Sequence, residues 1–261
     1  MSKGVIYIAN GKKYIEEAVQ SARSLKNKMP GMNITLFSSE DVKSPYFNNV
    51  ILIKNDKLCK ECPHMAKQIY ISRSPYEHTL FLDTDTYICD DISELFALLE
   101  KFDIAASHAA LRVTHKDSLI PKSFPEFSSG AIVFRKSPEV KKIFSDWFSL
   151  YNQQRAGMNG KYIIQDQLTF REALYASNAR IATLTPEYNC YFICPIYLEG
   201  PVKILHGRYP HMEYIAREIN KKTKMRVFIL GIGTLAFNDR HPLITLILQR
   251  FKYILKWRSR L

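Results

Sequence analysis

Short apolar runs alternate along the chain with segments in which apolar residues recur every three or four positions. The run at residues 5–9 is followed by apolar residues spaced as on one face of a helix, namely Ile15, Ala18, Val19, Ala22 and Leu25. Pro30 and Gly31 end this helix. Further strand-like runs lie at residues 34–37, 50–53, 79–82, 104–106, 131–134, 181–184 and 202–205. The alternation predicts an α/β domain with a largely parallel sheet.

Three later segments have the pattern of helices. Residues 91–94, Asp-Ile-Ser-Glu, have the spacing of a capping box and predict a helix that continues to Lys101. Residues 138–151 and 165–176 also have helical periodicity. Long loops are expected at residues 109–125 and 153–162. Loops of that length are more often functional lids than simple connections.

Composition supports one large domain with a short appendage. The chain has 261 residues, of which 46% are apolar, and this is enough to bury a substantial core. The formal net charge is +12, and residues 217–261 hold eleven basic residues against two acidic ones. The rest of the chain is nearly balanced, with 26 basic and 23 acidic groups. We therefore expect a nearly neutral body and a basic tail.

The tail changes character along its length. Residues 227–237 form an apolar run of eleven residues, which is too short to span a bilayer. Beyond Pro242, apolar residues recur at helical spacing among basic ones, with Trp257 near the end. A basic amphipathic helix with an aromatic residue is typical of an element on an anionic membrane surface. An ordinary helix packed on the domain is the alternative.

The N-terminus and the cysteines indicate the compartment. The first apolar run is only five residues long and has the pattern of a strand, so we expect no signal peptide and a cytoplasmic protein. Five cysteines without a regular framework fit a reducing compartment. Cys59 and Cys62 have the spacing of zinc ligands, which Cys190 and Cys194 would complete to four. The second pair has three intervening residues, which favours reduced thiols instead.

Two aspartates stand at the end of one predicted strand. Asp83 and Asp85 follow an apolar run, and because side chains alternate along an extended chain, both carboxylates point to the same side. In open α/β sheets, ligands bind beyond the carboxyl ends of the strands. Mg²⁺ and Mn²⁺ take oxygen ligands and can bridge two carboxylates to a diphosphate. The pair predicts a metal site, although a solvated acidic turn has the same sequence.

Longer segments carry a resemblance to a known group of enzymes. An N-terminal βα unit precedes the segments SRSPYEHTLFLDTDTYICDDISELF, FSSGAIVFRKS, DQLTFREAL and VKILHG. In this order and spacing they resemble the GT-A fold glycosyltransferases, and among these the retaining glycogenin-like and lipopolysaccharide galactosyltransferase-like enzymes. The resemblance covers residues 4–210 and implies a Rossmann-like α/β fold that binds a nucleotide-diphosphate sugar.

The resemblance implies a metal site for Mn²⁺ or Mg²⁺. Asp83 and Asp85 match the metal-binding D-x-D motif, and His206 matches the histidine that completes the site. In the family, Gly-Lys-Pro-Trp usually follows this histidine. Here Gly207 is present, but Arg208 follows it and the Lys-Pro-Trp portion is missing. Arg208 is a permanent cation with a forked donor set that suits a diphosphate.

The resemblance also assigns residues to the nucleotide. Ala9 and Asn10 match the nucleotide-binding end of the first strand. Tyr14 is expected either to stack on a uracil ring or to pack on the first helix. Lys67 stands where the family has a basic residue that holds the donor, and a solvated helix face accounts for it equally well.

Further matches concern the transferred sugar and the stereochemistry. Ser129 and Gly130 match the segment that lines the donor-sugar pocket, and a glycine there lets the backbone approach a ligand closely. Asp166 and Gln167 match an Asp-Gln pair beside the anomeric carbon, although an acidic residue at a helix start is stabilising in itself. A retaining enzyme would use the leaving phosphate and Gln167. An inverting enzyme needs a carboxylate base, for which Asp166 and Asp103 are candidates.

Two other classes of protein share single features with this sequence. Phosphatases of the haloacid dehalogenase type have a D-x-D-x-[TV] motif, but here Tyr87 replaces the final residue and the motif lies far from the N-terminus. A nucleic-acid-binding protein would explain the net charge, but the basic excess lies in the tail and the body lacks a matching patch.

Together these features predict a GT-A catalytic domain at residues 1–215 and a basic, partly amphipathic extension at residues 216–261. The expected activity is metal-dependent transfer of a hexose from a nucleotide sugar, a UDP-sugar, to a glycan or lipid-linked acceptor, with retention of anomeric configuration. The expected location is the cytoplasmic face of the membrane, with no nucleic-acid partner. The sequence does not specify the sugar, the acceptor or the oligomeric state.

Overall fold

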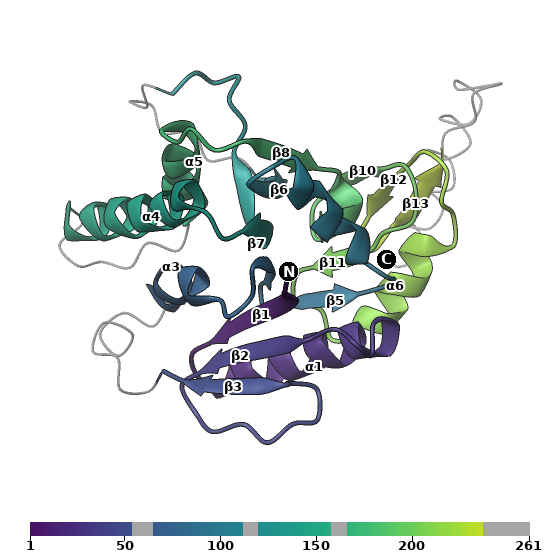
Figure 1. Ribbon diagram of the computed structural model, residues 1–261. Coiled ribbons are helices and arrows are strands. Elements are labelled where there is room, and N and C mark those ends of the chain that lie inside the picture. Colours follow the sequence, from purple (N-terminus) through teal and green to yellow (C-terminus); the bar gives the residue numbers. More distant parts are fainter. Residues whose placement is uncertain (54–64, 112–119, 158–165, 237–261) are drawn as a thin grey trace.

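The computed structural model of the chain describes residues 1–53, 65–111, 120–157 and 166–236. Its centre is a seven-stranded sheet with the strand order β3-β2-β1-β4-β7-β6-β8 (Figure 1). The strands are β1 (Lys3–Ala9), β2 (Ile34–Ser38), β3 (Asn49–Leu52), β4 (His78–Leu82), β6 (Ile104–His108), β7 (Phe127–Arg135) and β8 (Ile181–Leu184). All of them are parallel except β7, which is antiparallel to both β4 and β6. The sheet is therefore largely parallel, as the sequence predicts.

Helices cover both faces of this sheet. The helices are α1 (Lys12–Lys28), α3 (Ala66–Tyr70), α4 (Pro138–Gly157), α5 (Gln167–Tyr175) and α6 (Met212–Asn220), with 3₁₀ turns η2 (Ile71–Arg73), η3 (Ser93–Glu100) and η4 (Pro186–Tyr188). Side chains alternate along β1, so that Val5 and Tyr7 pack under α1 and η3 while Ile6 packs under α3, α4 and α5. Because both faces of the sheet are covered, every residue of β2 and of β4 is buried.

Two small sheets flank the central one. One has the order β5-β11-β9 and the other the order β10-β12-β13. Their strands are β5 (Thr86–Ile88), β9 (Cys190–Tyr191), β10 (Ile196–Leu198), β11 (Ile204–His206), β12 (Arg226–Ile229) and β13 (Gly233–Ala236). β5 begins directly after the two aspartates and pairs antiparallel with β11, so that Thr86 lies opposite His206. This pairing joins segments 120 positions apart in the sequence.

Two expectations differ from the structure in detail. The helix expected from residue 91 to Lys101 is the 3₁₀ helix η3, and the Asp91 carboxylate accepts a hydrogen bond from the backbone N–H of Ser93 at 2.7 Å. The expected start of the extension, residue 216, lies inside α6. Residues of α6 and β12 pack with β10 and β11 around a third apolar cluster, to which Ile219 and Phe228 belong. Residues 216–236 therefore pack on the body of the protein.

The amphipathic segment after Pro242 lies outside the described residues, as do Cys59 and Cys62. Cys190 and Cys194 are free thiols, and Cys190 is buried in the third cluster. Among the helices that the structure describes, none is both long and apolar enough to cross a membrane.

Candidate active site

A cleft of about 480 Å³ opens at the carboxyl ends of the parallel strands. Asn10 follows β1, Asp83 follows β4 and His108 ends β6, and all three line the cleft. β7 runs in the opposite direction, so its beginning meets these strand ends and contributes Ser129. The cleft therefore lies where open α/β sheets bind their ligands.

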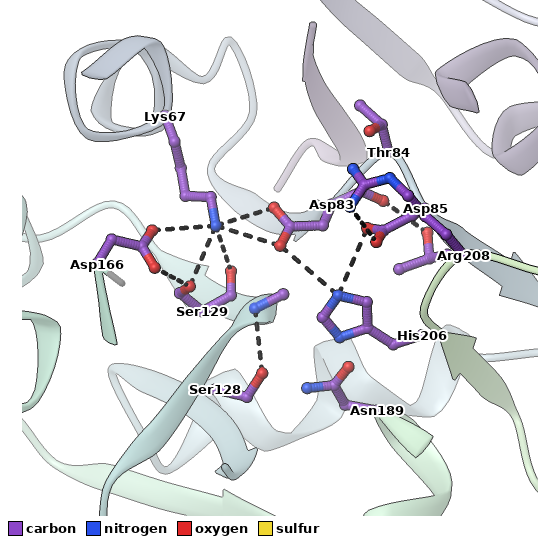
Figure 2. Close-up of polar contacts among 12 residues, drawn as sticks. Lys67, Asp83, Thr84, Asp85, Ser128, Ser129, Asp166, Asn189, His206 and Arg208 are labelled. Carbon is purple, nitrogen blue, oxygen red and sulfur yellow. Dashed lines mark hydrogen bonds and ion pairs between the residues drawn. The ribbon is translucent and has the colours of Figure 1, made fainter. Parts of the chain in front are cut away.

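Asp83, Asp85 and His206 converge in this cleft (Figure 2). The His206 imidazole Nε2 lies 3.5 Å from Asp85 Oδ1 and 3.8 Å from Asp83 Oδ2. One ligand atom from each residue lies within 4.8 Å of the others. Backbone hydrogen bonds fix the turn, because Asp83 N–H donates to the Gly130 carbonyl at 2.8 Å and Gly207 N–H donates to the Asp85 carbonyl at 3.0 Å.

Gly130 makes room for the imidazole. A Cβ atom at this position would lie 2.1 Å from His206 Cε1 and 2.6 Å from Nδ1, which no side chain tolerates. The backbone of Gly130 belongs to β7 and has no positive φ, so the requirement for glycine is one of space. The predicted close approach at Gly130 thus involves a protein side chain, the imidazole of His206.

The electrostatics of the three residues are linked. Burial alone would raise the pKa of Asp85, but the interactions with His206 and Arg208 lower it to about 2. Burial alone would lower the pKa of His206, but Asp85 and Asp83 raise it above its ordinary value. The cluster therefore favours a positive charge between two carboxylates, which is the condition that a divalent cation satisfies.

The donor set fits Mn²⁺ or Mg²⁺. Both metals accept carboxylate oxygens, and Mn²⁺ also accepts imidazole nitrogen. Octahedral ligands lie about 3 Å apart when adjacent and about 4 Å apart when opposite, and the imidazole-to-carboxylate distances of 3.5 and 3.8 Å fall in this range. Buried His206 Nδ1 has no hydrogen-bond partner within the described part of the chain, while Nε2 faces the two carboxylates.

Lys67 joins the aspartates to the other side of the cleft. Its Nζ lies 2.9 Å from Asp83 Oδ1 and 3.2 Å from Asp166 Oδ2, and it donates to Ser129 Oγ at 3.1 Å (Figure 2). Burial would lower the pKa of Lys67, but Asp166 and Asp83 raise it. The lysine is therefore a partly buried cation inside the cleft and does not lie on a solvated helix face.

Asp166 is turned toward this cation, away from its own helix. It occupies the N-cap position of α5, yet its side chain makes no capping hydrogen bond. Oδ1 accepts from Ser129 Oγ at 2.9 Å, and Oδ2 is within 3.5 Å of Gln68 Nε2 as well as paired with Lys67. Gln167, the first residue of α5, also lines the cleft. The alternative of simple helix-terminal acidity does not explain this orientation.

Asp103 lies at the other edge of the sheet. It precedes β6, and its carboxylate forms ion pairs with Arg135 at 2.5 Å and with Arg180 at 3.3 Å. Because Asp103 stands at the amino end of β6, it lies at the opposite end of the strand from the cleft. As a candidate base for the reaction, Asp103 is therefore wrong.

Arg208 lies between the cleft and α1. Its Nε and Nη2 donate to the Glu17 carboxylate at 2.8 and 3.1 Å, and Nη1 lies 3.3 Å from Asp85 Oδ2. Its guanidinium is also 5.7 Å from the centre of the Tyr14 ring. Tyr14 itself lines the cleft and packs partly against the core under α1, so its two expected positions are compatible.

Some expected residues do not line the cleft, and other residues do so unexpectedly. Ala9 is fully buried in the sheet, and Gly207 lies beside the cleft with φ of +128°. The sequence reasoning missed Asn189 and Tyr191, which line the cleft, and Glu17, which holds Arg208 beside it. Asn189 and Tyr191 belong to a segment with no recognisable motif, and Glu17 has the spacing of an ordinary exposed helix position. Only the position of Glu17, one helical turn after Tyr14, indicated a place near the cleft.

Comparisons with known proteins address the fold. No protein-family model matches the chain, and no curated protein matches its sequence. Several solved structures are similar to it, and three of them are described below. The galactosyltransferase LgtC, in complex with donor and acceptor sugar analogues, has a TM-score of 0.52 at 13% identity over 79% of this chain and 87% of its own.

The glycosyltransferase GlyE of Streptococcus pneumoniae has a TM-score of 0.54 at 15% identity, over 80% of this chain and 55% of its own. Mouse xyloside xylosyltransferase 1 has a TM-score of 0.52 at 16% identity, over 80% of this chain and 98% of its own. Both structures align with the same share of this chain, and at such low sequence identity the similarity concerns the fold. The chain therefore has the GT-A fold that these glycosyltransferases share.

Proposed function

We propose that the protein is a metal-dependent glycosyltransferase that takes a sugar from a nucleoside-diphosphate sugar, a UDP-sugar, and transfers it to a glycan or lipid-linked acceptor. The observation that carries the proposal is the convergence of Asp83, Asp85 and His206 in one cleft of a GT-A fold. The cleft volume of about 480 Å³ is within the usual range for small-molecule sites, about 300–1,000 Å³.

The chain offers charges for the leaving diphosphate. A divalent cation held by Asp83, Asp85 and His206 would stabilise the negative charge that develops on the departing phosphate. Arg208 lies 3.3 Å from Asp85 and is half exposed, so its guanidinium can reach a phosphate oxygen beside the same carboxylate. Asn10 and Tyr14, near the end of β1, are the candidates to hold the nucleoside.

The other side of the cleft offers hydrogen bonds for the sugar. Lys67 and Ser129 hold the Asp166 carboxylate in a fixed orientation, in which it can accept hydrogen bonds from sugar hydroxyls. Gln167 adds an amide at the same wall of the cleft. These groups suit recognition of a polyhydroxylated ligand.

The same contacts support retention of configuration. Both oxygens of Asp166 are engaged by donors, and an amide such as Gln167 cannot take a proton, so neither side chain is suited to act as a base. The bond between the anomeric carbon and the diphosphate oxygen would break, and the bond to the acceptor oxygen would form on the same face. The proton of the acceptor hydroxyl would pass to the departing phosphate oxygen.

The basic tail supports a location at a membrane surface. Residues 237–261 carry six of the basic residues and only one acidic residue, Asp239, and they lie outside the described residues. Attraction to anionic lipids at the cytoplasmic face would place the cleft beside lipid-linked acceptors.

The test is a donor screen. Purified protein is incubated with Mn²⁺ and a panel of UDP-, GDP- and ADP-sugars, and thermal stabilisation and release of free sugar are measured with and without EDTA. Proton NMR of the first sugar released gives the anomeric configuration. We expect stabilisation and slow hydrolysis with a UDP-sugar, dependence on Mn²⁺, and a retained anomer. Release of phosphate from p-nitrophenyl phosphate without any preference for a nucleotide sugar would instead indicate a phosphatase.

A further inference from the structure

A second hollow, of about 1530 Å³, lies beside the cleft between α1 and α6. In Figure 1, α6 lies beside the C-terminal half of α1, and β5 lies above α1. One wall is the outward face of α1 from Lys13 to Asn27, the floor is the segment from Thr84 to Tyr87, and the other wall is the segment from Gly207 to Arg217. The fourteen helical steps from Lys13 to Asn27 make the groove roughly 20 Å long.

Three tyrosines give this groove aromatic surfaces. Tyr87 lies in the floor, while Tyr209 and Tyr214 lie in the wall and are 37% and 48% exposed. The Tyr209 ring is held edge-on to the rings of Phe192 and His211, with centroids 6.4 Å apart in each case. Exposed tyrosines with an apolar ring and a polar hydroxyl can pack on the C–H faces of pyranose rings and bond their hydroxyls.

The polar lining of the groove is balanced in charge. Its ionised residues are four basic and four acidic side chains, namely Lys13, Arg23, Arg208 and Arg217 against Glu16, Glu17, Asp85 and Glu213. Gln20 and Asn27 add amides on the exposed face of α1. Nucleic acids and other polyanions need an excess of basic groups, and an amphipathic peptide helix needs an apolar groove. A neutral polyhydroxylated ligand fits this lining better than either.

The groove is continuous with the catalytic cleft. Thr84, Asp85 and Arg208 line both hollows, and Arg208 is held in the boundary by its two hydrogen bonds to Glu17. Thr84 Oγ also donates to Glu17 at 2.8 Å, which fixes the same carboxylate. A chain lying in the groove would therefore lead directly to the proposed metal site.

We infer that the groove between α1 and α6 binds the neutral oligosaccharide part of the acceptor or product. The inference rests on the proposed glycosyl transfer only for the choice of a glycan as ligand. It adds a binding site that begins at Asp85 and Arg208 and extends along α1, beyond the cleft assigned to the donor.

The test is direct binding of neutral tetrasaccharides built from glucose, galactose and N-acetylglucosamine, without metal or donor. Binding to the full chain is measured by calorimetry, and contacts are measured by saturation-transfer NMR. Tyr214→Ala and Gln20→Ala remove one group from each wall. Tyr197→Ala is the matched control, because Tyr197 is 49% exposed on β10 and does not line the groove. We expect about tenfold weaker binding for Tyr214→Ala, a smaller loss for Gln20→Ala and no change for Tyr197→Ala.

The inference is overturned by the absence of binding by every tetrasaccharide in the set, or by equal binding by the wild type and Tyr214→Ala. Preference for a sulfated tetrasaccharide of the same length would also contradict the neutral lining. Donor hydrolysis is measured on the same variants and is expected to stay unchanged. Hydrolysis without tetrasaccharide binding refutes the groove alone, whereas absence of hydrolysis from the wild type refutes the proposed function.

Discussion

Replacing Gly130 by alanine tests how the strand β7 supports the candidate metal site. The new methyl group would lie 2.1 Å from His206 Cε1, whereas carbon atoms in contact stay about 3.5 Å apart. The imidazole must therefore move by about 1.4 Å, because the methyl group is fixed to a strand that hydrogen-bonds to Asp83. No backbone strain is added, since Gly130 has no positive φ.

This displacement exceeds what a metal ligand can tolerate. Metal–ligand distances hold to within about 0.2 Å, so a shift of more than 1 Å removes His206 as a ligand. We expect Mn²⁺ affinity to fall by at least about tenfold to 100-fold, which is the loss seen when only a residue that holds a metal ligand in place is mutated. Overpacking costs about 1–3 kcal/mol of stability, which lowers the melting temperature of a chain of this size by roughly 2–10 °C.

The assay is Mn²⁺ binding at 25 °C by electron paramagnetic resonance, with folding checked by circular dichroism. Gly31→Ala is the control, because a Cβ at Gly31 meets nothing within 4 Å and its φ is not positive. Gly31→Ala should bind Mn²⁺ like the wild type. A folded Gly130→Ala protein with wild-type Mn²⁺ affinity would refute the assignment of His206 to the metal site.

Three further predictions concern other parts of the molecule. Asp103→Asn should lower stability by about 2–3 kcal/mol through loss of charged hydrogen bonds to Arg135 and Arg180, seen in a melting curve, while donor hydrolysis per folded molecule stays unchanged. These arginines lower the pKa of Asp103 despite its burial, so the stability that Asp103 contributes is present above about pH 4 and is lost as pH falls below that value. The difference in stability between variant and wild type should therefore shrink in acid. Gln167→Ala should lower the rate of sugar transfer more than donor affinity, and an unchanged transfer rate would remove Gln167 from the site. Deleting residues 241–261 should abolish sedimentation with anionic vesicles and leave donor hydrolysis intact. Binding of the intact chain to these vesicles should weaken as salt rises, and an intact protein that does not sediment would end the membrane proposal.

The sequence predicts most of the sheet and the centre of the site. Buried parallel strands are apolar runs, and polar residues that end such runs gather at one edge, which is why Asp83 and Asp85 could be recognised. His206 followed from the resemblance and from its place after an apolar strand. The structure adds why the two aspartates lie beside His206, because the strand that follows them, β5, pairs with β11.

The parts that were not predicted depend on contacts across the fold. Glu17 holds Arg208 from a position 191 residues away, and in its own segment only its place one turn after Tyr14 distinguishes it from other polar helix residues. Lys67 could belong to a solvated face until α3 is packed against β1 and α4. Asp103 was open to better prediction, because a residue that precedes a parallel strand lies at the edge opposite the cleft.

The central claim is that the two aspartates and His206 bind a divalent cation that is needed for a UDP-sugar. The most direct test is Mn²⁺-dependent binding and hydrolysis of that donor by Asp85→Asn, measured by calorimetry and by release of free sugar beside the wild type. The amide keeps the shape of the side chain but loses its charge, so we expect donor binding in the presence of Mn²⁺ to weaken by about 100-fold and the melting temperature without metal to stay near that of the wild type. Wild-type hydrolysis with unchanged dependence on Mn²⁺ in Asp85→Asn would contradict the account.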